Sequence, residues 1–424
     1  MMNKHQQSGM TTLLITSMLL IVALLFSLAS YKNLFYQIKR TQNEVLARQA
    51  HWAAEGGLEC GYSKIKQETN LSNITKPDYF SSSCDNSKLT VSSKNIDTGQ
   101  YELLAESNIN LAVKNIKKII VAGSNRSSGA MKAASDLILD FSGGISKIYP
   151  DPGTKGKSGY ECVLLRYAGK VEIRGLLTNE GLHWIFPPST DFHLGLPHSY
   201  LSYPNCNSNY KSKVKDSAIT ATSRPVDFGE DYVKDTTFDP FYDTFSVKRS
   251  DWKKGVRDKS TVISGSTNCS KDIAGSISAD SDRIWVEGDC DLGANVSLIQ
   301  TAITKAGIAG IVLVVQDGIL SVNGAFTLDA LVYHFKTPDS SFVPTEAKWE
   351  PLSAKGELLP EEKSYVAYFQ NGAFQPRGGY VLDAPGLTAK FRGSLDFNFN
   401  SDVFKDALDD LKEVKWQQGS WHDF

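Results

Sequence analysis

SGMTTLLITSMLLIVALLFSLAS, residues 8 to 30, is an apolar run without a formal charge. Residues 13 to 29 are almost continuously apolar, and the first charged side chain after the run is Lys32. About 20 apolar residues in a helix, rising ~1.5 Å each, span the ~30 Å hydrocarbon core of a bilayer. We therefore expect residues 10 to 31 to form a helix that can cross a membrane.

Two interpretations of this run predict different mature chains. Ser27, Leu28 and Ala29 resemble the cleavage site of a secretory signal peptide, whose removal would leave Ser30 as the first residue. Alternatively, residues 1 to 9 are a short polar leader that ends at Gly9, and Met10 opens a run that the mature chain keeps. The residues after position 31 favour retention, because they continue the helix.

The continuation is rich in helix-forming residues and contains no proline up to about Gln67. A helix from Met10 to about Ile65 would be roughly 80 Å long, far more than a bilayer is thick. We therefore expect residues 32 to 67 to lie outside the membrane, packed on a globular head. Apolar residues recur there at roughly helical spacing, at Leu34, Phe35, Ile38, Val45, Leu46, Trp52 and Ala53.

The segment ARQAHWAAEGGLECGYSKI, residues 47 to 65, carries an A-A-E-G-G-L-E motif about forty residues after the Gly9–Met10 junction. This order resembles the amino-terminal region of PilX-type minor pilins of type IV pili, with a class III prepilin signal. The ending WQQGSWHDF resembles the W-x-x-G-S-W-x-x tail of the same family. The resemblance covers residues 1 to about 123 and the last ten or so. The motif residues are Ala53, Ala54, Glu55, Gly56, Gly57, Leu58 and Glu59.

The resemblance implies a route and a set of partners. Prepilin peptidase would cut after Gly9 and methylate Met10, and the chain would stand in the inner membrane of a Gram-negative bacterium with its head in the periplasm. It would then enter the pilus tip at the cell surface. The implied partners are other minor pilins, the major pilin, the inner-membrane assembly platform and, as a further candidate, a tip adhesin.

Leu14 departs from the common pilin pattern. Most pilins keep a Glu at the fifth residue after the cut, where it pairs with the amino terminus of a neighbouring subunit. A carboxylate in the membrane costs several kcal/mol unless it is paired. A subunit with no neighbour ahead of it can lack that Glu, so Leu14 predicts a position at or near the filament tip, where assembly is primed.

Length and composition bound the rest of the chain. The 424 residues are 41% hydrophobic and 22% charged, and about 355 of them follow the helix, enough for one large or two ordinary domains. The net charge of −2 gives no general attraction to nucleic acid or acidic lipid.

We expect an α+β fold: a long amino-terminal helix packed on a small antiparallel sheet within residues 68 to 125, followed by a β-rich head. YELLAESNI (101 to 109) and NIKKIIVAG (115 to 123) are two expected strands of that sheet. Short strands with Gly or Asn at their corners fill the head, residues 126 to 424, with a possible subdivision near 260. They fit an irregular β-sandwich or a few turns of a β-solenoid, and no period chooses between them. Residues 402 to 414 are expected to be helical.

Six cysteines lie beyond the membrane segment. Their even number and the absence of a Cys-x-x-Cys pair favour disulfides in an oxidising compartment over zinc or redox chemistry. Short loops close at the least entropic cost, so we expect sequential pairing. The expected bonds are Cys60–Cys84, Cys162–Cys206 and Cys269–Cys290.

No motif predicts catalysis, a cofactor or a metal site. A Walker loop, a hydrolase-type Ser elbow and a His-Glu-x-x-His pattern are all missing from the sequence. His183, His193 and His198, near Asp191, match no metal-ligand spacing. The acidic run lacks the oxygen order of a calcium loop, and we expect it to be solvated. It comprises Asp227, Glu230, Asp231, Asp235, Asp239 and Asp243.

A basic run follows the acidic one. Basic residues around an aromatic ring are typical of proteins that grip phosphates and stack on bases. The simpler interpretation, which we favour, is that the run pairs with the acidic run before it. The candidate nucleic-acid contacts are Lys248, Arg249, Trp252, Lys253, Lys254 and Arg257.

Three hypotheses of function follow. The first is a tip-located minor pilin that primes type IV pilus assembly. The second is a K-type pseudopilin at the tip of a type II secretion pseudopilus, a group that also lacks the membrane Glu but carries a mainly helical inserted domain. The third, compatible with the first, is a head that binds a surface, a glycan or DNA.

Overall fold

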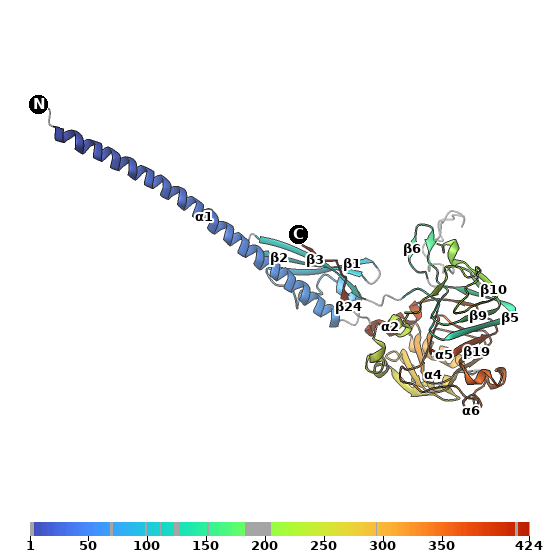
Figure 1. Cartoon of the computed structure of the whole chain (residues 1–424). Coiled ribbons are helices and arrows are strands. Elements are labelled where there is room, and N and C mark those ends of the chain that lie inside the picture. The colour runs from blue at the N-terminus through green and yellow to red at the C-terminus, as the bar shows by residue number, and fades with distance from the viewer. Residues whose placement is uncertain are drawn as a thin grey trace, which may run out of the picture. The chain divides into compact units, whose positions relative to one another are not determined.

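The computed structural model describes residues 4–67, 71–97, 100–110, 112–122, 127–150, 152–182, 205–293, 295–411 and 414–423. The chain forms two compact units, shown in Figure 1. The first unit comprises Met1–Ala122 and Val414–Phe424, and the second comprises Gly123–Glu413. The second unit is therefore an insertion within the first.

The first unit is one long helix and an antiparallel sheet. Helix α1 (Lys4–Gln67) is 64 residues long, and a short 3₁₀ turn (Leu71–Thr75) leads toward the strands. Strands β1, β2 and β3 pair antiparallel in that order, and β24 and β25 both pair antiparallel with β3. In Figure 1 these strands lie beside the second half of α1. Their bounds are β1 (Leu89–Asp97), β2 (Gln100–Ile109), β3 (Ala112–Ala122), β24 (Val414–Trp416) and β25 (His422–Asp423).

The core of the first unit lies between one face of α1 and the sheet. Ala54, Leu58 and Ile65 are buried on that face, at spacings of four and seven residues that keep them on one side of a helix. They join a cluster with sheet residues such as Leu103 and Ile120. Cys60 and Tyr62 of α1 pack against this cluster, whereas the side chains from Met10 to Tyr31 are exposed.

The carboxy-terminal segment belongs to the first unit and not to the head. Residues 414 to 424 were expected in the head, but Val414 pairs with Ala122 and His422 pairs with Lys117 at the edge of the first unit's sheet. The two strands are three and two residues long, too short to show a strand pattern in the sequence.

The second unit is built from two long sheets. The β4 sheet has the order β11-β8-β4-β21-β18-β15-β13-β12, and the β5 sheet has the order β10-β9-β5-β22-β19-β16-β14, with β23 also on β5. The strands are β4 (Met131–Ala133), β5 (Asp136–Tyr149), β8 (Leu165–Tyr167), β9 (Val171–Asn179), β10 (Lys213–Ile219), β11 (Tyr232–Lys234), β12 (Thr261–Ser264), β13 (Arg283–Glu287), β14 (Cys290–Asp291), β15 (Ile311–Gln316), β16 (Leu320–Asn323), β18 (Ala330–Phe335), β19 (Val366–Asn371), β21 (Tyr380–Asp383), β22 (Thr388–Arg392) and β23 (Phe397–Asn398).

The arrangement of these strands is a β-solenoid. Consecutive strands such as β4 and β5, or β18 and β19, alternate between the two sheets, and neighbouring coils pair in parallel. A sandwich of hairpins would pair antiparallel, so the parallel ladders decide between the two expected folds. Buried residues align in register along the β4 sheet, in the order Leu165, Met131, Tyr380, Val332, Leu313 and Ile284.

The coils do not stack in chain order. The last complete coil, β21 and β22, pairs with the first, β4 and β5, through Tyr380↔Met131 and Ala389↔Leu137. We call this junction the seam. The chain therefore starts in the middle of the solenoid, continues through β8 and β9, and then returns from the other end. Strand β12 pairs with β13 in the same sheet, so the subdivision expected near residue 260 is not a boundary.

Short helices and loops cover the outer faces of the solenoid. On the β4 sheet, α2 (Pro240–Phe245) and α7 (Asp402–Lys405) contribute Phe241, Phe245 and Phe404 to a cluster with Trp285 and Tyr333. On the β5 sheet, the segment around α6 (Glu346–Trp349) packs on Phe369. The helix expected over 402 to 414 is shorter than predicted: α7 passes into a 3₁₀ helix (Asp406–Leu411), and Val414 already belongs to β24.

Candidate functional site

The first half of α1 is suited to a membrane. It is the one helix among the described residues that is long and apolar enough to span a bilayer. The side chains from Met10 to Tyr31 are exposed. The hydroxyls of Thr16 and Ser17 donate to the carbonyls of Thr12 and Leu14, each at 2.9 Å, so polar groups in this stretch are satisfied within the helix.

The residues of the expected leader junction lie within this helix. Gly9 and Met10 both fall in the regular part of α1, and Leu14 is exposed four residues after Met10. Cleavage after Gly9 stays a prediction. The retained helix would run without a break from Met10 to Gln67.

The A-A-E-G-G-L-E motif is where α1 meets the sheet. Ala54, Gly57 and Leu58 face the sheet and are buried, whereas Gly56 faces open space and Glu59 is exposed. A Cβ on Gly57 would lie 2.8 Å from Leu89 Cδ1. The small residues of the motif therefore let the helix backbone approach the sheet closely.

The carboxy-terminal segment packs beside this motif. The Trp416 ring stacks on Tyr62 with centroids 4.7 Å apart, and the Tyr62 hydroxyl donates to the Val414 carbonyl at 2.9 Å. The Trp421 ring lies edge-on to His51, at 6.2 Å. The two segments that carry the family resemblance, far apart in sequence, thus contact each other in the first unit.

A charged group reinforces that contact. Asp423 lies 2.6 Å from Lys114 Nζ on β3 and 3.5 Å from His51 Nδ1 on α1. Glu55 of the motif lies 3.5 Å from His51 Nε2, one turn away. These side chains are partly exposed, so each pair contributes at most about 1 kcal/mol. These contacts orient the carboxy-terminal segment along α1 but add little to the free energy of unfolding.

All six cysteines form disulfides, with the sequential pairing that the spacings predicted. Cys60–Cys84 links the end of α1 to the loop before β1. Cys269–Cys290 ties α4 (Cys269–Ser276) to β14, and Cys162–Cys206 closes the loops near β9 and β10. Each bond lies within one unit.

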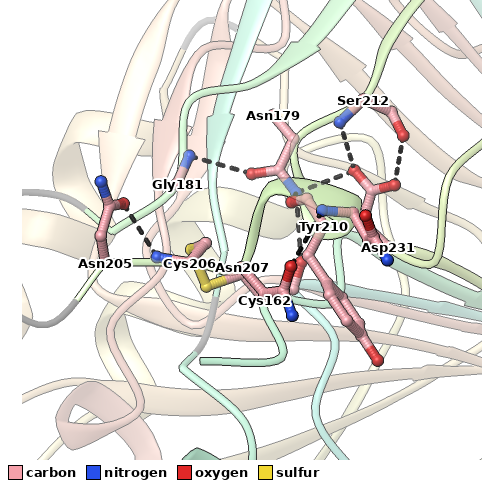
Figure 2. Close-up of a disulfide and its surroundings, with 10 residues drawn as sticks. Cys162, Asn179, Gly181, Asn205, Cys206, Asn207, Tyr210, Ser212 and Asp231 are labelled. Carbon is pink, nitrogen blue, oxygen red and sulfur yellow. Dashed lines mark hydrogen bonds between the residues drawn. A yellow bond between two sulfur atoms is a disulfide. The ribbon is translucent and has the colours of Figure 1, made fainter. Parts of the chain in front are cut away.

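Figure 2 shows a polar network beside the Cys162–Cys206 disulfide. Asp231 is fully buried and accepts hydrogen bonds from the Ser212 hydroxyl, the Ser212 amide at 3.1 Å and Asn179 Nδ2 at 2.9 Å. Burial raises the pKa of the Asp231 carboxyl, and the donated hydrogen bonds oppose that shift. Asn179 also donates to the Tyr210 carbonyl at 2.7 Å, so the network fixes three loops at this end of the solenoid.

The expectation of a solvated acidic loop is wrong for much of the acidic run. Besides Asp231, Asp239 caps α2 by accepting from the Phe241 amide at 3.0 Å. Asp243 is nearly buried and accepts from Lys132 Nζ at 2.6 Å. Among the described residues no group of three or more His, Cys, Asp or Glu side chains is placed to hold a metal ion. His183, Asp191, His193 and His198 lie outside the described residues.

The basic run is divided between internal contacts and exposed lysines. Arg257 Nε lies 2.6 Å from Glu287, and Trp252 stacks on the buried Trp285 with centroids 5.9 Å apart. Arg249 binds a residue of the acidic run, Asp239, as the simpler interpretation expected. Exposed lysines remain at Lys248, Lys253, Lys254 and Lys259.

Arg249 lies at the centre of a polar cluster in the second unit. Its Nη2 donates to Asp383 Oδ1 at 2.9 Å and Oδ2 at 2.7 Å, while Nε and Nη2 donate to Asp239 Oδ1 at 3.0 and 2.7 Å. The Tyr333 hydroxyl donates to Asp383 Oδ2 at 2.6 Å. Burial raises the pKa of Asp383 to about 6, although the Arg249 charge acts in the opposite direction. Sequence reasoning missed Asp383 and Tyr333, because neither belongs to a local motif.

No protein-family model, curated protein or solved structure matches this chain. Its function is therefore inferred from its residues and geometry.

Proposed function

We propose that this protein is a PilX-type minor pilin of a type IV pilus. Residues 10 to 31 would hold it in the inner membrane until it is extracted into the pilus tip, where it would prime assembly together with other minor pilins. The head would stand in the periplasm first and at the cell surface later. The role is structural, with no catalytic step.

One observation carries the proposal. The apolar helix continues without interruption into a helix half that packs on an antiparallel sheet, and the A-A-E-G-G-L-E motif meets the carboxy-terminal segment there. A helix that only anchored a soluble domain would have no reason to share a close-packed core with it. A subunit that is pulled from a membrane into a filament needs that rigid connection.

The position of Leu14 supports a place at the tip. The side chain is apolar and exposed on the helix, in a stretch that offers no carboxylate to a neighbouring amino terminus. The amino group of a mature chain starting at Met10 would remain available to a carboxylate on the subunit added behind it. Assembly would then proceed from this subunit in one direction.

The alternative is a K-type pseudopilin of a type II secretion system. That group carries a mainly helical inserted domain, whereas the inserted unit here is a solenoid of parallel strands. This observation favours the pilus over the pseudopilus. Major pilin, prepilin peptidase and the assembly platform are the partners that the proposal requires.

The first test is the mature amino terminus, determined by mass spectrometry of membrane and sheared-filament fractions. We expect a peptide that begins with methylated Met10 in both. Gly9→Val should block its formation, because the peptidase needs the glycine, whereas Ser8→Ala should leave it unchanged. A terminus at Ser30 would mean that the apolar run is discarded, and the proposal would be wrong.

A further inference from the structure

A pocket opens at the seam of the solenoid. It has a volume of about 540 Å³, within the range of small-ligand sites, and lies where β4, β18 and β21 end. Ala134 follows β4, Lys336 follows β18, and Asp383 is the last residue of β21. All of its described walls belong to the second unit.

Two cations with unused donors face this pocket. Arg249 is fixed by Asp239 and Asp383 through Nε and Nη2, which leaves the two N–H groups of Nη1 without a partner among the described residues. Lys336 is held by its backbone amide, which donates to the Asp383 carbonyl at 2.9 Å. Its half-exposed ammonium makes no ion pair within the described part of the chain.

The remaining wall combines apolar and polar residues. Phe238 offers a half-exposed ring, and three prolines fix the backbone around it. Asp239 Oδ2 and the Ser340 hydroxyl add polar groups at the edge. A pre-formed wall with both apolar and polar groups suits a compact ligand that has one apolar face and one charged group.

We propose that this pocket binds an acidic saccharide, with the sugar carboxylate between Arg249 Nη1 and Lys336 Nζ and the ring against Phe238. The unused polar groups of the pocket are two cationic donors, on Arg249 and Lys336, and one carboxylate oxygen, Asp239 Oδ2. This balance favours an anion over a neutral sugar. A single, open pocket suits a terminal sugar ring better than an extended nucleic-acid strand, which needs a groove. This inference rests on the proposed role of the head at the cell surface and specifies its ligand.

The test is saturation-transfer NMR with the full-length protein in detergent micelles. The probes are glucuronic and galacturonic acid, with glucose and galactose as neutral counterparts and a short single-stranded oligonucleotide as the competing class. We expect a signal from at least one acid and a weaker one from its neutral counterpart. Lys336→Gln should weaken binding about tenfold through loss of one charge-assisted hydrogen bond. Lys336→Glu should abolish it.

Lys254→Gln is the matched control, because Lys254 is exposed on α3 (Trp252–Gly255), outside the pocket. It should bind the acids as the parent does. Absence of any sugar signal, equal signals from neutral sugars, or insensitivity to Lys336→Gln would each overturn the inference. So would oligonucleotide binding that Lys336→Gln removes while the sugars stay silent. None of these outcomes affects cleavage at Gly9 or entry into filaments, so the pilin proposal is tested separately.

Discussion

Asp383 is a carboxylate that the fold places out of water at the end of a strand. Its two oxygens are occupied by Arg249 and Tyr333, and its side chain is fully buried. Full burial of a charge is tolerated because Arg249 neutralises it, yet the desolvation still favours the protonated form. The stability of the second unit should therefore depend on pH through this residue.

The direction follows from the raised pKa. The folded protein binds a proton at Asp383 near pH 6, whereas the unfolded chain binds it near 3.8. Stability from this residue is therefore greatest below about pH 4 and is lost as the pH rises through 6, by about 3 kcal/mol at most. In Asp383→Asn this pH dependence should disappear from thermal unfolding curves. Burial lowers the pKa of His334, so its contribution to stability changes with pH in the opposite direction. That contribution should remain in the variant, where it serves as an internal reference. An unchanged pH profile in the variant would contradict the assignment.

Gly57 and Gly56 form a matched pair on α1. Gly57→Val would push side-chain atoms against Leu89 and Ala105, so we expect a loss of about 1 to 3 kcal/mol. Gly56→Ala adds a methyl in open space and should stabilise the helix by about 0.5 to 1 kcal/mol. Hydrogen exchange of peptides from β1 to β3 measures both effects within the first unit. Equal effects of the two changes would show that α1 does not pack closely on the sheet.

At the scale of elements, the pairing of β24 with β3 depends on aromatic contacts more than on its own hydrogen bonds. Strand β24 has three residues, too few to be stable alone, and Trp416 adds the stack on Tyr62 and the Lys118 ammonium 4.2 Å from its ring centre. Trp416→Ala should release β24 at a cost of about 2 kcal/mol.

Limited proteolysis measures that release. The parent should resist cleavage between residues 414 and 424, and Trp416→Ala should be cut there. Trp52→Ala is the control, since Trp52 is exposed on α1 and should leave the segment protected. Equal protection of the two variants would mean that the ring contacts do not hold the strand.

Local signals explain which elements were predictable from sequence. The apolar helix, β2 and β3 each show their pattern within a dozen residues, and short spacings led to the disulfides. The solenoid was only one of two options, because its coils vary in length and α5 (Val296–Ala306) interrupts the repeat. The seam and the pocket were not predictable, because they join strands from opposite ends of the second unit.

For the candidate site the same distinction holds. Gly9, Met10 and the A-A-E-G-G-L-E motif are contiguous in sequence and were named from it. A pairing of the basic run with the acidic run was expected from their opposite charges, and Arg249 and Asp239 make one such pair. Asp383 and Tyr333 come from separate coils and were not expected. A ligand pocket assembled from several coils leaves no motif that a single sequence can display.

At the scale of the whole molecule, the seam makes the second unit depend on contacts distant in sequence. Strands β4 and β5 obtain a partner on their inner side only when β21 and β22 have been formed. Ordering that much chain before the contact is made slows folding and exposes strand edges in the meantime. The two disulfides of this unit reduce the conformational freedom of the unfolded chain, so less chain has to be ordered before the seam forms.

The insertion of the second unit between β3 and β24 has a mechanical consequence. A pull on the head reaches the first unit at two neighbouring points, Ala122 and Val414, which are paired across the sheet. Strand β3 continues covalently through β2 and β1 to α1, whereas β24 is attached to β3 by backbone pairing and ring stacking. Under tension β24 can peel away one hydrogen bond at a time while β3 keeps the load path intact. Breaking the pairing between β24 and β3 would then absorb part of the mechanical work before the covalent backbone carries the full force.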